Sequence, residues 1–435
     1  MRRALWALPS AAALLVFWPA ARFGFVNFDD QAVLLRNPVI SGAWTWREAF
    51  TRAHATTYAP LCWLSLRAVC SVLGFKAALL HSLLLLAHAA CAAAVFLLAR
   101  ALYSGPRREL AACFAALLFA LHPVQAEAVG EAACVAVVPA ALLALASILL
   151  FLRGRRRAAW LLFALSGLWH WEAVALPAVL LCLGAAWIDA APFALIAACV
   201  AALNAAAKRA AVGYSSFAAR PGAAARGALH ALGSLLWPDE RLPVYVYSSG
   251  PRLWESGLLF LAVCGLVFLA RKRRPALAAA WIGFLALLAP PLLLTGKEPT
   301  WGHDHYLYLA CVPLCLLAGG ALARTRSRAV LAAAAMLLAL CGLEARRDVM
   351  LWRDSETLWR HAFARDPSSP IFAYRLGETL MQDRGRVDEA IAYFRIQKRL
   401  DPDQAEARKV LGYAYNRRGF ELMEKGRRRE AAASF

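Results

Sequence analysis

The chain has 435 residues, of which 61% are hydrophobic and only 17% are charged, and its mean hydropathy is +0.53. Soluble domains carry roughly 45–50% apolar and about 25% charged residues, so a soluble core of this size could not hide the excess apolar content. The formal net charge of +20 is divided among short clusters between apolar runs, which is typical of a membrane protein and not of a nucleic-acid binder.

Apolar runs of membrane-spanning length alternate with clusters of Arg and Lys through residues 1–344. We predict an all-α polytopic membrane domain with about eleven spans. The runs cover residues 5–25, 77–98, 110–126, 132–152, 158–169, 173–187, 192–206, 253–270, 275–294, 306–323 and 329–343. With the N-terminus inside, the strongest basic clusters all face the cytoplasm, and the chain after residue 344 is expected outside.

Two segments between the runs are expected to be outer loops. Residues 26–75 are rich in Trp, Asn, Asp and Pro, which favours interfacial helices outside the membrane. Residues 207–252 contain an apolar piece, 228–237, that is too short to span, so a re-entrant or interfacial helix fits best. This second loop is also basic, in conflict with the rule that Lys and Arg stay on the cytoplasmic side.

The predicted topology separates the acidic residues by side. Within residues 1–344, only Glu109 and Asp189 fall on the cytoplasmic side, and the other acids lie near the outer face. Carboxylates at the ends of apolar spans are costly unless they are paired or solvated in a cavity. A polar outer cavity is therefore where we expect function.

An acidic pair follows the first span directly, in the segment F-V-N-F-D-D. Asp29 and Asp30 are its last two residues, flanked by aromatic and amide side chains. Adjacent carboxylates in a low dielectric raise each other's proton affinity, so one of the pair could act as a general base near neutral pH. The alternative is a solvated acid pair that ends a helix.

Histidines mark the second and third spans. His81 and His88 lie seven residues apart on one face of the second span, where packed, hydrogen-bonded residues are the simpler interpretation. The third span ends in H-P-V-Q-A-E-A-V, which begins at His122 and contains Glu127. Pro123 interrupts the helix there and frees backbone groups that a cavity could use.

Two later motifs carry further polar side chains. The segment Trp169-His170-Trp171-Glu172 caps the fifth span, although an aromatic interface belt also explains its tryptophans. The segment H-D-H-Y-L-Y-L, which contains His305 and Tyr306, opens the tenth span. Its His-x-His pair lacks a third ligand, and none of the 11 cysteines has zinc-ligand spacing with His, so we expect no metal.

Residues 345–435 have a different character, with high charge, helical periodicity and internal repetition. Leu376-Gly377 and Leu411-Gly412 are 35 residues apart, as are Pro367 and Pro402. This is tetratricopeptide (TPR) spacing, in which small residues let antiparallel helices pack closely. Because two repeats or fewer bury no continuous core, we expect the tail to lean on the membrane domain or a partner. The chain ends at Phe435 inside an expected second helix, and a plain helical hairpin is the alternative.

These elements, in this order, resemble the membrane O-mannosyltransferases with C-terminal TPR repeats and their bacterial relatives, in the GT-C glycosyltransferase class. The segments that carry the resemblance are F-V-N-F-D-D with Asn37-Pro38 after it, Tyr58-x-Pro60-Leu61, His81 and His88, Leu118-Phe119-Ala120-x-His122-Pro123-x3-Glu127, Tyr306-x-Tyr308-Leu309 and the stretch 352–359 before the repeats.

The resemblance implies a GT-C-like domain over 1–344 and an extracytoplasmic TPR region over 345–435, in the inner membrane of a bacterium. It implies transfer of a mannose-like sugar from a polyprenyl phosphate to a hydroxyl acceptor, such as protein Ser or Thr, outside the cytoplasm. It gives Asp29 and Asp30 catalytic roles. The residues expected to bind substrate are His81, His122, Glu127, Glu172, His305 and Tyr306.

The sequence departs from the relatives at two places. Residues 134–137 replace a charged motif, and His305 stands where Arg is usual. For the cation that stabilises the leaving phosphate, the candidates by predicted side are Lys208, Arg209, Lys297 and His305. The alternative function is a non-catalytic membrane scaffold whose tail binds protein partners; no nucleic-acid partner is expected.

Overall fold

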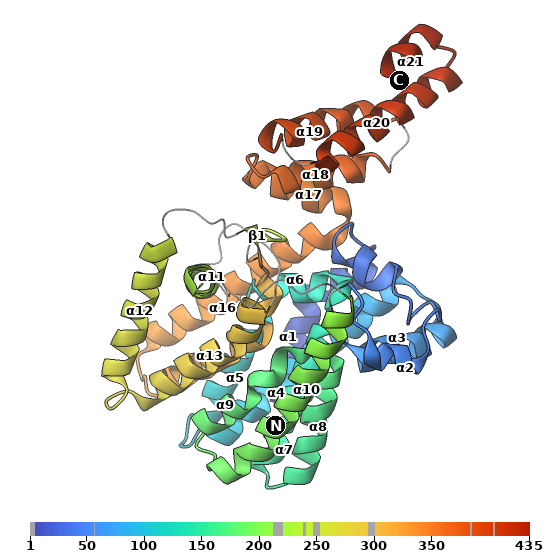
Figure 1. The fold of residues 1–435 in the computed structure, drawn as a ribbon. Coiled ribbons are helices and arrows are strands. Elements are labelled where there is room, and N and C mark those ends of the chain that lie inside the picture. Colours follow the sequence, from blue (N-terminus) through green and yellow to red (C-terminus); the bar gives the residue numbers. More distant parts are fainter. Residues whose placement is uncertain are drawn as a thin grey trace. The chain divides into compact units, whose positions relative to one another are not determined.

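The computed structural model describes residues 5–55, 57–211, 221–237, 241–246, 253–294, 301–382, 385–402 and 405–435. These residues form helices and one antiparallel pair of two-residue strands, β1 (Tyr245–Val246) and β2 (Trp301–Gly302) (Figure 1). Contacts divide the chain into two units. The first comprises Met1–Phe23 and Ala32–Met350, and the second comprises Gly24–Gln31 and Leu351–Phe435.

The predicted domain boundary after residue 344 differs from this division in two ways. The first unit continues to Met350, because residue 344 lies inside the long helix α16 (Arg328–Val349). The segment Gly24–Gln31, which includes the acidic pair, belongs to the second unit although it follows the first predicted span.

The first half of the first unit contains a helix at each predicted apolar run, although several helices begin or end some residues away from the predicted bounds. Its helices are α1 (Ala7–Phe17), η2 (Trp18–Arg22), α2 (Trp46–Thr51), α3 (Pro60–Leu73), α4 (Ala77–Leu102), α5 (Arg108–Leu121), α6 (Gln125–Gly130), η4 (Ala132–Val135), α7 (Val137–Leu152), α8 (Arg156–Trp169), η5 (Trp171–Ala175), α9 (Leu176–Cys182) and α10 (Trp187–Ala211). A π-helical segment, η3 (Asp30–Leu35), lies between η2 and α2. The predicted outer loop 26–75 thus contains two helices, α2 and α3.

The second half contains α11 (Pro221–Leu236), α12 (Leu253–Ala270), α13 (Pro275–Leu294), η6 (Asp304–Tyr306), α14 (Leu307–Ala310), α15 (Val312–Leu322) and α16. The short helix η7 (Met350–Arg353) starts at the last residue of this unit and belongs mostly to the second. The tenth predicted run is bent by 53° between α14 and α15. Pro313 stands in the first turn of α15, where its missing N–H ends the preceding helix at little cost.

Five helices of the described residues are long and apolar enough to cross a membrane, or six if the bent pair is one span. They are compatible with a multi-pass membrane protein, and the predicted all-helical fold is confirmed. The predicted run 173–187 is not one helix, because α9 ends at Cys182 and Gly184 turns the chain with φ of +88° before α10 begins. A count of eleven spans stays a prediction.

Helix α4 lies at the centre of the first unit and packs against α1, α5 and α7. Its buried positions include several small residues, among them Ala89, Cys91 and Ala92, which let neighbouring helices approach closely. A similar close approach joins α15 to α5, since a Cβ atom on Gly319 would lie 2.6 Å from the Ala111 carbonyl oxygen.

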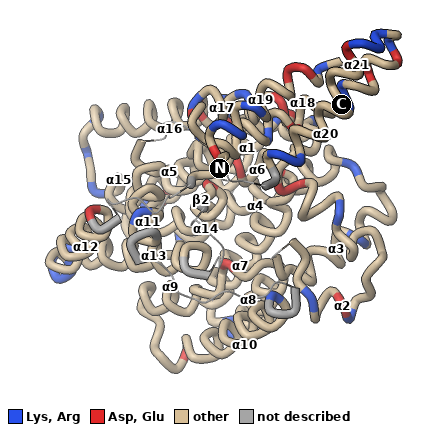
Figure 2. Tube along the Cα trace, turned by 45° about the horizontal axis from the view of Figure 1, so that its top comes forward, with Lys and Arg blue, Asp and Glu red and all other residues tan. Residues whose placement is uncertain are grey.

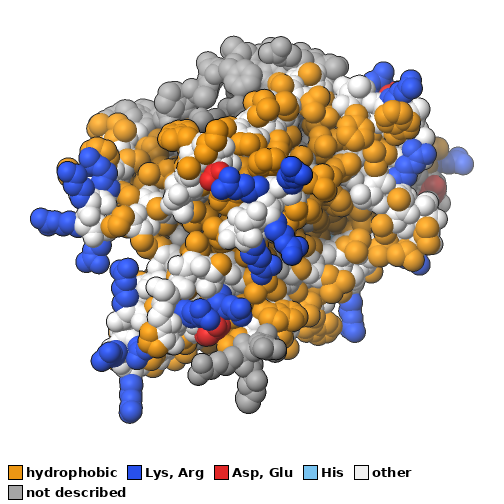
Figure 3. Space-filling view, turned by 90° about the horizontal axis from the view of Figure 1, so that it is seen from below, with side chains coloured by type: hydrophobic (Ala, Val, Ile, Leu, Met, Phe, Trp, Pro, Cys, Tyr) orange, Lys and Arg blue, Asp and Glu red, His pale blue; other side chains and the backbone are white. Residues whose placement is uncertain are grey.

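Charge is distributed differently in the two units. Figure 2 shows long uncharged stretches in the helices of the first unit and Lys, Arg, Asp and Glu close together in α17–α21. In Figure 3, Lys and Arg side chains are scattered over a largely hydrophobic face, at its centre as well as its edges, and few acidic side chains are visible. This distribution suits an apolar domain with basic loops.

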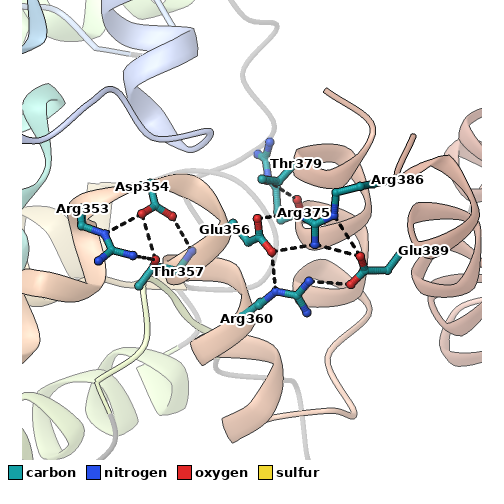
Figure 4. A network of polar contacts seen from close by, with 9 residues as sticks. All are labelled: Arg353, Asp354, Glu356, Thr357, Arg360, Arg375, Thr379, Arg386 and Glu389. Carbon is teal, nitrogen blue, oxygen red and sulfur yellow. Dashed lines mark hydrogen bonds and ion pairs between the residues drawn. The ribbon is translucent and has the colours of Figure 1, made fainter. Parts of the chain in front are cut away.

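The second unit contains five successive helices, α17 (Ser355–Arg365), α18 (Pro370–Leu380), α19 (Val387–Leu400), α20 (Ala405–Glu424) and α21 (Arg428–Ser434), each packed on the next. Gly377 on α18 lies against α19, since a Cβ there would lie 2.7 Å from the Phe394 ring. Glu356 and Glu389 bind Arg360 and Arg386 at 2.5–2.8 Å, which joins α17 to the start of α19 (Figure 4).

Candidate functional site

The centre of the candidate site is the Glu127 carboxylate, which is buried in the first unit on the short helix α6. Its Oε2 accepts a hydrogen bond from the Asp304 backbone N–H at 2.8 Å. Its Oε1 accepts one from Nδ1 of His305 at 2.6 Å, and Nδ1 of His303 lies 3.5 Å from the same oxygen. The H-P-x3-E motif and the H-D-H-Y-L-Y-L motif, 178 residues apart, therefore meet in space.

Pro123 explains how Glu127 reaches this position. Helix α5 ends at Leu121, and α6 starts four residues later. His122 stabilises the turn between α5 and α6. Its Nδ1 accepts a hydrogen bond from the Val124 N–H at 3.2 Å, and its Nε2 donates one to the Leu235 carbonyl at 3.0 Å. Both ring nitrogens are therefore bonded to backbone and stabilise this turn, and the predicted substrate-binding role of His122 stays a prediction.

A buried ion-pair chain adjoins the histidines. Arg241 Nη1 donates to Asp304 Oδ2 at 2.8 Å, and its Nη2 donates to the Ser234 carbonyl at 3.1 Å. Arg241 Nε also lies 3.7 Å from Asp348 Oδ2 on α16. Residue 241 thus connects α11, η6 and α16.

Glu172 and His170 form a second group in the first unit. His170 Nδ1 lies 3.7 Å from Glu172 Oε1, and both side chains are largely buried. Lys208 Nζ lies 4.6 Å from the centre of the Trp171 ring, a cation–π contact. The predicted substrate-binding residue Glu172 therefore has an imidazole at its carboxyl end and an ammonium group over the adjacent tryptophan.

The two glutamates differ in proton affinity. Burial raises the pKa of Glu172 to about 7, partly offset by His305 and reinforced by the charge of Glu127. Burial acts the same way on Glu127, but His305 and the hydrogen bonds from both histidines outweigh it and leave its pKa below the usual range. The site thus pairs an ionised carboxylate with a carboxyl group that changes charge near neutral pH.

Two sets of side chains in the first unit bring possible metal ligands within 4.8 Å of one another: Glu127 with His303 and His305, and Glu131 with Cys134 and His305. In the second set, the Cys134 thiol donates to Glu131 Oε2 at 3.7 Å. Cys134 belongs to the stretch 134–137, a departure from the pattern that the sequence resembles, and this stretch therefore lies close to His305.

The acidic pair lies in the second unit, where the tail helices hold the preceding residues. The Asn27 N–H donates to Ser355 Oγ at 2.8 Å, its Nδ2 donates to Glu378 Oε2 at 3.0 Å, and its carbonyl accepts from Trp359 Nε1 at 3.1 Å. Asp30 is buried and accepts from the Val26 N–H at 2.9 Å, while Asp29 is half-buried. The two units are described separately, so no distance joins this pair to Glu127.

The remaining predicted residues lie in three places. Tyr306 contacts the His303 and His305 rings at 5.2 and 4.7 Å between centroids. His81 is buried on α4, edge-on to Phe23 at 6.0 Å. Of the predicted cations, Lys297 and the Arg209 side chain lie outside the described residues.

Sequence reasoning missed Arg241, Tyr245 and Asp348. Tyr245 OH lies 3.5 Å from Asp304 Oδ2, so all three belong to the same polar group. Arg241 stands in the basic loop 207–252, where neither periodicity nor a motif marks it. The sequence pointed to this loop in one way: the loop is basic, although Lys and Arg are expected to stay on the cytoplasmic side.

An apolar cavity of about 780 Å³ lies in the first unit and is lined by residues of α4, α7, α9, α13, α14 and α15. Leu176 and Leu309 are lining residues, and each stands four residues after a member of the polar group, Glu172 or His305. Arg273, Arg274 and Arg324 also line it. The volume is within the roughly 300–1,000 Å³ of small-molecule pockets.

Comparisons of this chain with protein-family models, with curated proteins and with solved structures found no match.

Proposed function

We propose that this protein is a GT-C-type membrane glycosyltransferase with about eleven spans and a TPR tail outside the cytoplasm. It moves a mannose-like sugar from a polyprenyl phosphate to a hydroxyl acceptor, such as protein Ser or Thr. The proposal rests on the resemblance, and one observation supports it most. The two motif elements that carry Glu127 and His305 contact each other in a buried polar group.

The apolar cavity supports a lipid-linked donor. A polyprenyl chain needs an apolar channel, and its phosphate needs polar groups where that channel ends. Glu172 and His305 each stand four residues before a cavity-lining leucine, Leu176 or Leu309, and the charged residues that line the cavity itself are Arg273, Arg274 and Arg324. The proposal is that the lipid chain lies in this cavity and that its sugar phosphate reaches the end where the two leucines stand.

The proposed reaction is a direct displacement. The carboxylate of Asp29 or Asp30 takes the proton of the acceptor hydroxyl, and the oxygen attacks the anomeric carbon. The bond from that carbon to the phosphate oxygen breaks, the phosphate leaves with the electron pair, and the configuration inverts. Lys208 and His305 are the described candidates to stabilise the phosphate charge.

Sugar transfer by the full chain in lipid nanodiscs tests the proposal. The wild type is expected to release polyprenyl phosphate from polyprenyl-phosphate mannose when a hydroxyl acceptor is present. Replacing both Asp29 and Asp30 by Asn should abolish release, whereas Glu255→Gln, at an exposed position of α12, should not. Full activity of the double variant would remove the aspartates as the base.

The scaffold function is the alternative, and the second unit favours it specifically. The tail helices bind Asn27 through three hydrogen bonds, so the segment before the acidic pair has a structural role independent of catalysis. A scaffold predicts that the wild type releases no polyprenyl phosphate with any acceptor, while a partner protein still binds the tail.

A further inference from the structure

We propose that Glu127, His303 and His305 bind a divalent transition-metal ion. The sequence contains a His-x-His pair without a third ligand nearby, and the fold brings Glu127 of α6 to these two histidines. One donor atom from each of the three side chains lies within 4.8 Å of the other two. Two imidazoles and one carboxylate are a common zinc ligand set that leaves a fourth position open.

The distances to Glu127 need only a small adjustment to accept the ion. Donors that are each about 2.1 Å from a tetrahedral metal lie roughly 3.4 Å apart. His303 Nδ1 is already 3.5 Å from Glu127 Oε1, whereas His305 Nδ1 is 2.6 Å from it and must move outward by less than one ångström. The His305 Nδ1 proton is donated to Glu127, and the His303 Nδ1 proton is donated to the Pro243 carbonyl at 3.1 Å. The ion would replace both protons, and the bond to Pro243 would be lost.

The surroundings orient the ligands. The Asp304 N–H fixes Oε2 of Glu127 at 2.8 Å, which leaves Oε1 directed at the two histidines. Asp304 in turn is held by Arg241. Such outer contacts are what metal-binding carboxylates and imidazoles use to keep their geometry.

The Glu127 carboxylate supplies negative charge at the point where both histidines approach it. A divalent ion held there would lie beside the proposed donor phosphate, although its binding does not depend on sugar transfer.

Zinc binding to the full chain in nanodiscs tests the inference. After treatment with a chelator, the protein is titrated with Zn²⁺ against a chromophoric competitor, and bound zinc is counted by mass spectrometry. We expect one Zn²⁺ per chain and a higher melting temperature when it is bound. Glu127→Gln, His303→Asn and His305→Asn should each weaken binding at least about tenfold. Asn keeps an N–H donor near the Nδ1 position, so these two variants should stay folded.

Two controls make the test specific. His88→Gln removes a buried histidine of α4 that bonds to Tyr308 and the Ala120 carbonyl, and it should leave zinc affinity unchanged. Cys134→Ser should also leave it unchanged. The inference is overturned if the wild type binds no stoichiometric zinc, or if His88→Gln weakens binding as much as His303→Asn. Loss of binding in Cys134→Ser alone would overturn it too, because the ion would then use Glu131, Cys134 and His305.

Discussion

At the scale of single residues, the candidate site depends on buried charges that are stable only as a group. Glu127, Asp304 and Arg241 are at most 8% exposed. Removing one partner of such a group leaves the other charge without compensation in a low-dielectric interior, which costs more than the pair contributes when intact. Substitution should therefore lower the free energy of unfolding most at a buried charged side chain that is paired with two others.

Arg241 is such a residue, because it faces both Asp304 and Asp348. Arg241→Ala should destabilise the folded chain by roughly 3–5 kcal/mol. Arg36→Ala, at an exposed position, should change stability by no more than about 0.5 kcal/mol. Thermal melting in nanodiscs compares the two, and equal melting temperatures would show that the Arg241 pairs are dispensable.

Glu172 makes stability depend on pH. Its pKa is raised from 4.5 to about 7, so the folded chain holds a proton that the unfolded chain loses between these values. The associated stability is complete below pH 4.5 and is lost as the pH rises through 7, by up to roughly 3 kcal/mol. Glu172→Gln should remove this part of the decline in melting temperature between about pH 5 and pH 8. An unchanged decline would contradict the burial of an ionisable Glu172.

At the scale of elements, close packing within the tail depends on where glycine stands. Gly377 and Gly412 occupy corresponding positions of the predicted repeats, yet of the two only Gly377 faces a ring, because a Cβ there would lie 2.7 Å from Phe394. Gly412 on α20 has nothing within 4 Å. The same residue type therefore has a packing role in one repeat and not in the next.

Alanine at these two positions should have opposite effects. Gly377→Ala should destabilise the α18–α19 pair by about 1–3 kcal/mol through overpacking. Gly412→Ala should stabilise α20 by up to about 1 kcal/mol, because alanine favours helix more than glycine does. Amide hydrogen exchange of tail peptides in the full chain measures both; faster exchange in the Gly412 variant would contradict the open space at that position.

At the scale of the whole molecule, hydropathy predicted the helical fold well. The reason is that hydropathy averages the apolar content of all residues in a helix. The all-helical architecture, the start of α4, the end of α7 and both ends of α13 agree with the apolar runs. The run 173–187 was wrong as a single helix, since Gly184 turns the chain without altering the average hydropathy. Glu127 and His305 were found as motif residues, but their contact could not be predicted, because spacing along the chain says nothing about a pairing across 178 residues.

The predicted orientation is testable with reporter fusions. An alkaline phosphatase fused after Phe435 should be active, because the tail is expected outside the cytoplasm, and one inserted at the Arg cluster 153–157 should be inactive. Activity at the Arg cluster and none at Phe435 would invert the topology.

We propose that transfer from a polyprenyl-phosphate sugar takes place at the Glu127 group. The single-turnover release of polyprenyl phosphate by the wild type, Glu127→Gln and Arg36→Ala in nanodiscs, with folding checked by melting, tests this proposal. We predict release by the wild type and Arg36→Ala, and a rate at least about a hundredfold lower for folded Glu127→Gln. A wild-type chain that releases nothing, or a Glu127→Gln chain that releases at the wild-type rate, would contradict the claim.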